Sequence, residues 1–326
     1  MSELSLVQAV NLALRRAMAD DARVIVLGED VGIDGGVFRA TDGLLAQYGE
    51  SRVLDTPLAE TAIAGVSIGL AAQGFRPVAE IQFIGFAYSC IDQLINHASR
   101  MRTRTQGRLT CPMVLRSPAG GGIRAVEHHS ESPEAMFAHI PGLKVVIPSS
   151  PRRAYGLLLS AIRDPDPVVF LEPTRLYRTA REDVADDGEG LPLARCSVLR
   201  RGRDVTIVSW GAMIKDALQA AERLAADNVE AEVIDVATLK PLDEVTILES
   251  VARTGRLVVV HEAPLTGGFG GEIAARVAGH GLMTLLAPIE RVCGYDTVMP
   301  YLRTEAFYMP GIEQIAAAVC RTMAYR

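Results

Sequence analysis

Cysteine is scarce in this sequence, and its spacing carries no recognisable signature. Five cysteines occur among 326 residues, and none belongs to a C-x-x-C pair. An odd number without paired spacing argues against a disulfide framework and against a zinc site, and it is typical of a reducing compartment. We therefore expect a cytoplasmic protein without structural disulfides.

Long apolar runs and an excess of basic charge are missing too. No stretch of about 18 apolar residues occurs, so we expect no membrane span, and the N-terminus lacks the basic start and apolar run of a signal peptide. The formal net charge is −6. Because nucleic-acid phosphates are bound by clustered Lys and Arg, this balance argues against a nucleic-acid partner.

Strand-like and helix-like hydrophobic patterns alternate along the chain. Strands alternating with helices predict an α/β fold, with mostly parallel sheets flanked by helices. The expected strands are 23–28, 76–82, 113–116, 144–147, 168–171, 205–209, 230–236 and 257–261. The expected helices are 5–20, 58–73, 87–104, 151–163, 211–226, 243–253 and 271–280.

The chain length indicates two domains, since 326 residues exceed the roughly 100–200 that a single domain usually holds. The stretch 179–192 is polar and acidic and shows no pattern of a buried core. It predicts a first domain over residues 1–180, a linker over 181–195, and a smaller second α/β domain over 196–326.

One short motif points to a different chemistry. Gly65-Val-Ser67-Ile-Gly69 matches the G-x-S-x-G nucleophile elbow of serine hydrolases, which requires a strand directly before the serine. Residues 55–64 instead resemble the start of a helix, with Pro57 suited to its first turn. We therefore favour a closely packed helix over a hydrolase that uses Ser67.

Histidines are few, and only two of the six are adjacent. His128 and His129 follow the run Gly120–Gly122 within a polar segment, and loops often carry catalytic groups. Glu60 stands just before the apolar segment 62–72. It either complements the dipole at a helix start or serves as an acid–base group, because a carboxyl group held against apolar groups has a raised pKa.

A set of segments stands in a characteristic order: Gly28-Glu-Asp-Val-Gly32, Asp55-Thr-Pro-Leu-Ala-Glu60, Glu80-Ile-Gln-Phe83, His129-Ser-Glu-Ser132, Ala161-Ile-Arg-Asp164, His261-Glu-Ala263 and Gly294-Tyr-Asp-Thr297. In this order they closely resemble the β subunit of the decarboxylating component of 2-oxo acid dehydrogenase complexes. The resemblance spans nearly the whole chain. It implies an N-terminal domain that binds the pyrimidine of thiamine diphosphate and a smaller C-terminal domain of transketolase type.

The resemblance implies roles for four side chains. Glu60 matches the glutamate that hydrogen-bonds N1′ of the aminopyrimidine, a contact that favours the imino tautomer and helps to generate the carbanion. Phe86 matches the aromatic side chain that packs on the pyrimidine, and Glu29 matches a glutamate between paired cofactors. His129, rather than His128, matches the histidine that faces the reacting intermediate and serves acyl transfer to a lipoyl group.

The diphosphate motif of thiamine enzymes, G-D-G followed by Asn, is absent from this sequence. Because a pyrophosphate without its metal would be poorly neutralised, this chain alone should not hold the cofactor. The family solution is an α subunit that carries the motif and most of the Mg²⁺ ligands, in an α2β2 heterotetramer. A lipoyl-bearing acyltransferase is the further partner. The resemblance also implies a potassium ion bound by backbone oxygens near Ala161, Asp164 and Asp166.

Two alternative functions stand beside this one. A non-catalytic binding protein could share the fold, but the joint presence of Glu60, Phe86 and His129 argues against it. Transketolases and 1-deoxyxylulose-phosphate synthases carry the diphosphate motif themselves, and this chain is too short to do so.

The resemblance implies a 2-oxo acid as the substrate, and a few segments bear on which one it is. Residues 35–41 and 82–88 look most like pyruvate-type sequences, which favours pyruvate dehydrogenase. Residues 130–135 are more similar to branched-chain types that use 2-oxoisovalerate, and acetoin is handled by close relatives as well. Discrimination by a methylene or two is worth only about 1–3 kcal/mol, so a few pocket residues could reverse the preference.

Overall fold

The computed structural model describes residues 2–325 and divides them into two compact units. Unit 1 comprises the chain up to Ala119 together with Met136–Leu193, and unit 2 comprises Gly120–Ala135 together with the chain from Ala194 onward. The division after Leu193 falls inside the segment predicted as a linker. The grouping of Gly120–Ala135 with the second unit has no counterpart in the predicted boundaries, which follow the chain linearly.

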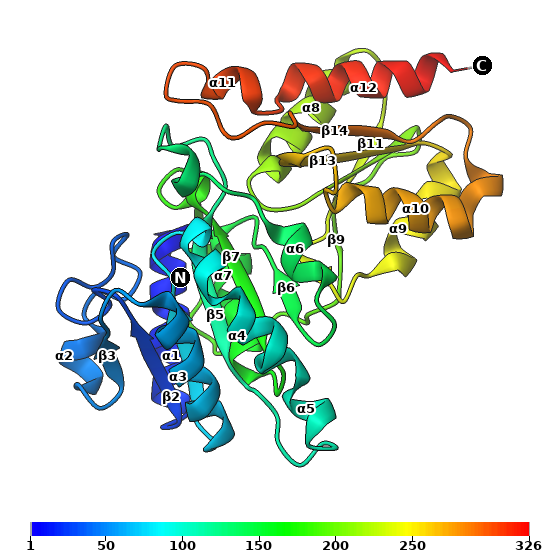
Figure 1. Cartoon of the computed structure of the whole chain (residues 1–326). Helices are drawn as coiled ribbons and strands as arrows, with labels where there is room; N and C mark the ends of the chain where they lie inside the picture. The colour runs from blue at the N-terminus through cyan, green and yellow to red at the C-terminus, as the bar shows by residue number, and fades with distance from the viewer. Residues whose placement is uncertain (1, 326) are drawn as a thin grey trace. The chain divides into compact units, whose positions relative to one another are not determined.

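Unit 1 is built on a parallel sheet (Figure 1). Every neighbouring pair of these strands is parallel, and β5 and β7 are buried along their whole length. Both faces of such a sheet must be covered, which explains the continuous apolar runs. The strands stand in the order β6 (Lys144–Val146), β7 (Val168–Pro173), β5 (Val114–Ala119), β4 (Arg76–Glu80), β2 (Val24–Gly28) and β3 (Val53–Asp55).

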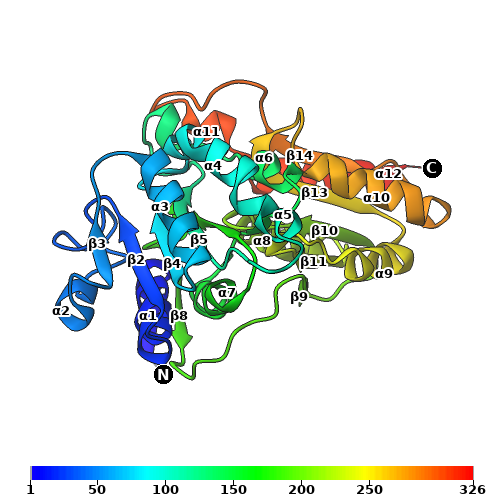
Figure 2. The same ribbon diagram turned by 60° about the horizontal axis from the view of Figure 1, so that its bottom comes forward.

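Right-handed crossovers decide which helix covers which face of this sheet. The connections β3–β4 and β4–β5 run in one direction across the sheet, so α3 (Glu60–Ala72) and α4 (Ile91–Asn96) lie on one face. The connection β6–β7 runs back, so α7 (Pro151–Arg163) lies on the other face, where it packs against α1 (Leu6–Asp20) (Figure 2). A capping box between Ser5 and Gln8 begins α1.

The helix predicted over 87–104 is wrong as a continuous element. The hydroxyl groups of Ser89 and Ser99 donate to the backbone carbonyls of Phe86 and Ile95, and such side-chain bonds offer the backbone an alternative to an unbroken helix. The segment forms four short helices: η1 (Ile84–Cys90), α4, η2 (Ala98–Arg100) and α5 (Met101–Arg104). The remaining short helices of unit 1 are α2 (Leu44–Tyr48) and η4 (Thr174–Leu176), while α6 (Glu134–His139) begins within Gly120–Ala135.

Part of the segment predicted as a linker is a strand. β8 (Arg181–Val184) pairs antiparallel with β1 (Ser2–Ser5) in a two-stranded sheet. The side chain of Val184 is buried, whereas the three residues before it are exposed. The acidic composition of this stretch therefore reflects an exposed edge strand.

Unit 2 holds a second sheet, in which four neighbouring strands are parallel and β9 is antiparallel. Figure 1 shows α8 (Met213–Ala226) and α12 (Ile312–Ala324) over one face of the sheet and α9 (Glu244–Thr254) and α10 (Gly270–Gly281) over the other. α8 buries residues at helical spacing, including Met213, Ala217 and Leu224, against a core that also contains Val233 and Val319. The order is β14 (Glu290–Gly294), β13 (Leu257–Pro264), β10 (Val205–Ser209), β11 (Ala231–Asp235) and β9 (Ser197–Arg200).

The other elements of unit 2 are η3 (Glu127–His129), α8 (Met213–Ala226), β12 (Thr238–Lys240), α9 (Glu244–Thr254), α10 (Gly270–Gly281), η5 (Leu282–Thr284), α11 (Glu305–Tyr308) and α12 (Ile312–Ala324). Two α/β units with mostly parallel sheets confirm the predicted fold class. Between residues 2 and 325, no helix has the length and apolar character needed to cross a membrane.

Candidate active site

Glu60 is the first residue of α3, and its side chain is half-buried. The preceding residue, Ala59, has no side chain that could cap the helix, and Glu60 is the acidic residue of the first turn, at the positive end of the helix dipole. The helix predicted over 58–73 is confirmed, with its start at Glu60. The position fits the interpretation of Glu60 as a complement to the helix dipole, and its acid–base role stays a prediction.

Glu29 directly follows β2 and is only 6% exposed. Burial raises the pKa of Glu29, and the negative charges of Glu60 and Asp30 raise it further, while a hydrogen bond from the backbone of Ala59 lowers it. Two carboxyl groups that repel one another favour the protonated form of the more buried one. The carboxyl ends of β2 and β3 thus bring Glu29 and Glu60 together.

Phe86 lies in η1, which packs against α3. The hydroxyl of Thr61 donates to the carbonyl of Ser89 at 2.7 Å and ties the two helices together. The half-buried ring of Phe86 meets Phe83 edge to face, with centroids 6.0 Å apart. Glu29, Glu60 and Phe86, predicted from distant segments, therefore gather in one part of unit 1.

A glycine-rich loop between β2 and α2 borders this carboxyl pair. The carboxylate of Asp55 accepts hydrogen bonds from the backbone amides of Gly32 and Ile33, and the latter bond measures 3.0 Å. Gly36 has φ +79, and a Cβ there would lie 3.0 Å from the carboxylate of Glu80. Only glycine meets both conditions without strain.

A network of buried charges joins the three neighbouring strands β4, β5 and β7. Arg116 on β5 donates to both oxygens of Glu172 on β7, at 2.6 and 2.8 Å, and also to Glu80 on β4. Burial raises the pKa of Glu80, and the charge of Arg116 counteracts only part of this effect. Pairing of this kind makes buried charges tolerable. This network could not be predicted from the sequence, because it depends on the register of three strands.

His129 lies in η3 of unit 2. Its ring is half-buried, whereas His128 is exposed. The amide of His129 donates to the carbonyl of Val126 at 3.0 Å, and that of Ser130 donates to Glu127 at 2.9 Å. Of the two adjacent histidines, His129 is thus the one held partly within the fold.

A second polar cluster of unit 2 was not predicted from the sequence. His261 is fully buried, stacks on Trp210 with centroids 5.2 Å apart, and lies 3.2 Å from the sulfur of Cys293. Trp210 donates to Glu134 at 3.2 Å. Burial lowers the pKa of His261 to about 4 and raises that of Glu134 to about 8. The neutral forms are therefore favoured, as the packing of such a core requires.

Two other features do not form catalytic sites. Ser67 sits in the middle of α3, fully buried, with its hydroxyl bonded to the carbonyl of Ile63 at 2.8 Å. No strand leads directly into it, so the serine hydrolase alternative is wrong.

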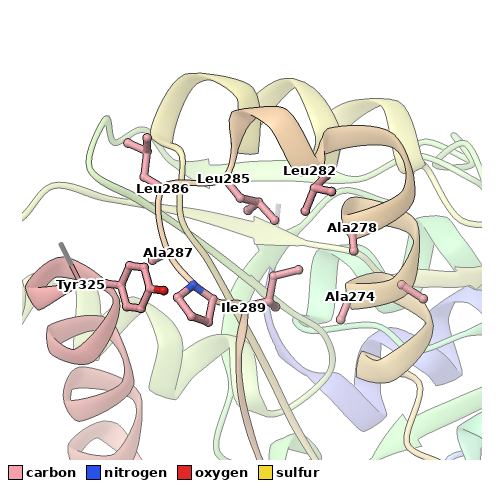
Figure 3. A pocket seen from close by; sticks show the side chains of 10 residues that line it. Ala274, Ala278, Leu282, Leu285, Leu286, Ala287, Ile289 and Tyr325 are labelled. Atoms are coloured by element: carbon pink, nitrogen blue, oxygen red, sulfur yellow. The ribbon is translucent and has the colours of Figure 1, made fainter.

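A groove of about 610 Å³ between α10, β14 and the end of α12 is shown in Figure 3. The side chains that line the groove are apolar apart from the Tyr325 hydroxyl. The groove offers no group for acid–base catalysis.

Comparisons with known proteins agree with this fold. Residues 2–180 match the transketolase pyrimidine binding domain, and residues 194–315 match the transketolase C-terminal domain. A solved structure described as a split-gene transketolase, an inactive β4 tetramer, superposes with a TM-score of 0.81 over 99% of both chains. Its sequence is 24% identical, so it supports the fold alone. The fold and the matched domains define a transketolase-like protein.

Closer relatives narrow the class. The pyruvate dehydrogenase E1 component subunit beta of Acholeplasma laidlawii is 46% identical over 98% of both chains. Those of Bacillus subtilis and Staphylococcus epidermidis are 46% and 44% identical over 97% and 100% of both chains. The chain belongs to the family of pyruvate dehydrogenase E1 β subunits, which confirms the resemblance inferred from its motifs. Membership implies dependence on thiamine diphosphate.

Proposed function

We propose that this chain supplies the pyrimidine half of a thiamine diphosphate site in a heteromeric pyruvate dehydrogenase, whose other half comes from an α subunit. The observation that carries the proposal is the pairing of Glu60, at the first turn of α3, with the buried Glu29, while η1, which holds Phe86, packs against α3. Within residues 2–325, the buried Oε1 atom of Glu29 has no hydrogen-bond partner. An orphaned buried oxygen fits a site that a polar ligand completes.

The residues on this chain act on the pyrimidine. The bound cofactor supplies the carbon nucleophile that attacks the 2-oxo acid. Glu60 holds a proton at N1′ of the aminopyrimidine, while the ring of Phe86 packs on the pyrimidine and fixes its orientation. Burial first, and then the charge of Glu60, raise the pKa of Glu29, so the two carboxyl groups lie close enough to interact.

In this proposal, His129 acts in the second half of the reaction, the transfer of the acyl group. The half-buried imidazole of His129 offers two ring nitrogens for proton transfer. Its role is proton transfer while the acyl group passes to the lipoyl group of the acyltransferase component. His128, which is exposed, has no part in that step.

An exposed apolar surface in unit 1 supports a subunit partner. Leu58 and Ile33 are 79% and 83% exposed, and Val66 is 53% exposed on the outer face of α3. Ala62, one turn before Val66 on α3, is exposed as well. Apolar side chains gathered around a candidate site are typical of a protein interface. The α subunit of an α2β2 heterotetramer is the partner that we assign to this surface.

The two metal ions that the resemblance implies, magnesium and potassium, are assigned differently. Magnesium belongs with the α subunit, because this sequence lacks the G-D-G motif. Potassium stays a prediction. The carbonyl of Ala161 accepts the amide of Asp164 at 3.3 Å, and the carbonyl of Asp164 accepts Arg76 at 3.2 Å. Lys144 pairs with the Asp164 carboxylate at 2.7 Å, and Arg102 pairs with Asp166 at 2.7 Å. These cations weaken the case for a bound ion there, and we give potassium no part in the reaction.

The free cysteines indicate the cellular compartment of the enzyme. All five are free thiols in the structure, and free thiols persist in reducing compartments. We place the enzyme in the cytoplasm on this ground.

Substrate choice tests the proposed function. The reconstituted α2β2 enzyme should use pyruvate with a kcat/KM at least about tenfold above that for 2-oxoisovalerate, since one to two methylenes are worth about 1–3 kcal/mol. Steady-state assays with pyruvate, 2-oxoisovalerate and acetoin, coupled to the acyltransferase, measure this ratio. A preference for 2-oxoisovalerate or for acetoin would show that the assignment of pyruvate is wrong.

A further inference from the structure

The segment Gly120–Ala135, called the His129 loop from here on, is fastened by one residue of β13. The Oε1 atom of Glu262 accepts a hydrogen bond from the amide of Gly121 at 3.2 Å and another from the hydroxyl of Ser132 at 3.1 Å. Beside them, the amide of Gly120 donates to the carbonyl of Glu131 at 2.8 Å. A single carboxylate therefore joins the start of the loop to its end.

A second carboxylate holds the first half of the His129 loop. Glu305, the first residue of α11, is only 4% exposed. Its two oxygens accept the amides of Gly122 at 2.7 Å and Arg124 at 3.0 Å. Arg124 has φ 58, a left-handed conformation that a non-glycine residue adopts only where its surroundings hold it. Hydrogen bonds from amides to a charged acceptor are among the stronger ones in proteins.

The glycine run at the start of the loop is matched to these carboxylates. Gly120 has φ +84, and a Cβ there would lie 1.9 Å from the Oε1 atom of Glu262. Gly122 has φ +87. Both positions therefore require glycine: the first because the carboxylate approaches so closely, and both because of their backbone conformation.

Other contacts hold the loop as well. Backbone bonds of the single turn η3 order residues 126–130, and Trp210 donates to Glu134 near the end of the loop. Residues 130–132 border a hollow of about 270 Å³. Glu262 and Glu305 together accept three backbone amides and one hydroxyl of the loop, and they fasten its glycine run to the rest of unit 2.

We propose that Glu262 and Glu305 are positioning residues that act through His129: they hold the His129 loop so that the imidazole stands ready for acyl transfer. The inference rests on the role proposed above for His129. Neither glutamate touches a reacting atom in this scheme. Their separation from the loop by more than a hundred residues in sequence means that unit 2, and not the local sequence, sets the geometry of the loop.

Glu305→Ala in the reconstituted α2β2 enzyme tests this proposal. Amide hydrogen exchange of the peptide covering residues 120–126 should become faster, because two amides lose their acceptor. Acyl transfer to a lipoyl domain should fall about tenfold, since small misplacements of a catalytic group are costly. Decarboxylation, followed with an artificial electron acceptor, should stay within about twofold.

Glu313→Ala is the matched control. Glu313 is an exposed glutamate of unit 2 that pairs with Arg223 at the surface, and its loss should change neither exchange nor acyl transfer. Should Glu305→Ala fail to fold, Gly120→Ala displaces the side chain of Glu262 instead, and it should give the same pattern. Unchanged exchange over 120–126 in the folded variants would overturn the proposal.

A double variant separates positioning from general support of the fold. If Glu305 acts through His129, adding Glu305→Ala to His129→Ala should cause no further loss of acyl transfer. A further loss of the full size, or an equal loss of decarboxylation in Glu305→Ala alone, contradicts a positioning role. Should His129→Ala impair both steps equally, the role proposed for His129 fails, whereas faster exchange in Glu305→Ala would still support the anchoring of the loop.

Discussion

Glu60→Gln in the α2β2 enzyme should abolish exchange of the C2 proton of bound thiamine diphosphate with solvent. Glutamine cannot hold an acidic proton at N1′, so the pyrimidine loses the group that drives its tautomeric shift. Acid–base groups typically contribute about 10²- to 10⁴-fold, and we expect kcat to fall by at least about 100-fold. Quenched-flow exchange in D₂O with NMR detection, at saturating cofactor, measures the effect.

Glu50→Gln is the control for that experiment. Glu50 is an exposed glutamate of the same unit, next to the end of α2, so its replacement should leave exchange and kcat unchanged. Normal C2 exchange in Glu60→Gln would remove Glu60 from its proposed role. Slow exchange in both variants would point instead to a general effect of lost negative charge.

His129→Ala should separate the two half-reactions. We expect acyl transfer to the lipoyl domain to fall about 100-fold, because the proton donor of that step is lost. Decarboxylation depends on Glu60 and on the cofactor, so it should fall by less than about tenfold. Single-turnover assays with the lipoyl domain, compared with turnover on an artificial electron acceptor, measure the two steps independently.

His128→Ala provides a closely matched comparison, since it removes an imidazole one residue away. Its side chain is exposed, whereas that of His129 is half-buried. It should behave like the unchanged enzyme in both assays. Equal losses of both steps in His129→Ala, or an acyl-transfer defect confined to His128→Ala, would contradict the role assigned to His129.

The sequence predicted the elements whose patterns are long and local. The buried strands β2 and β10 and the amphipathic helices α1 and α8 follow from their hydrophobic spacing within a residue or two. The prediction of one continuous helix over 87–104 is wrong. The spacing of this segment is helical, but serine hydroxyls and short turns interrupt the backbone bonds. Periodicity does not reveal such local competition.

The candidate site was predictable only where a motif marked it. Glu60 and His129 stand in recognisable segments, so their numbers could be proposed before the fold was known. Glu262 stood in one of those segments, but its bond to Gly121 spans 141 residues and could not be inferred. Glu305 reaches Gly122 across 183 residues. The run Gly120–Gly122 was the one local sign that something approaches the loop closely.

The buried ion pairs around Arg116 were beyond prediction for the same reason. Arg116, Glu80 and Glu172 lie on three neighbouring strands, and their contact depends on strand order and register. A charged residue within a strand looks from the sequence like an exposed one. Tertiary pairing reverses that expectation, because a buried charge is stable only beside its partners.

Isothermal titration calorimetry of thiamine diphosphate and Mg²⁺ tests the shared site most directly. The proposal predicts no measurable binding to this chain alone, because the chain offers the pyrimidine half and lacks the diphosphate motif, and tight binding once the α subunit is added. Tight binding of the cofactor by the isolated chain would contradict a site divided between two subunits.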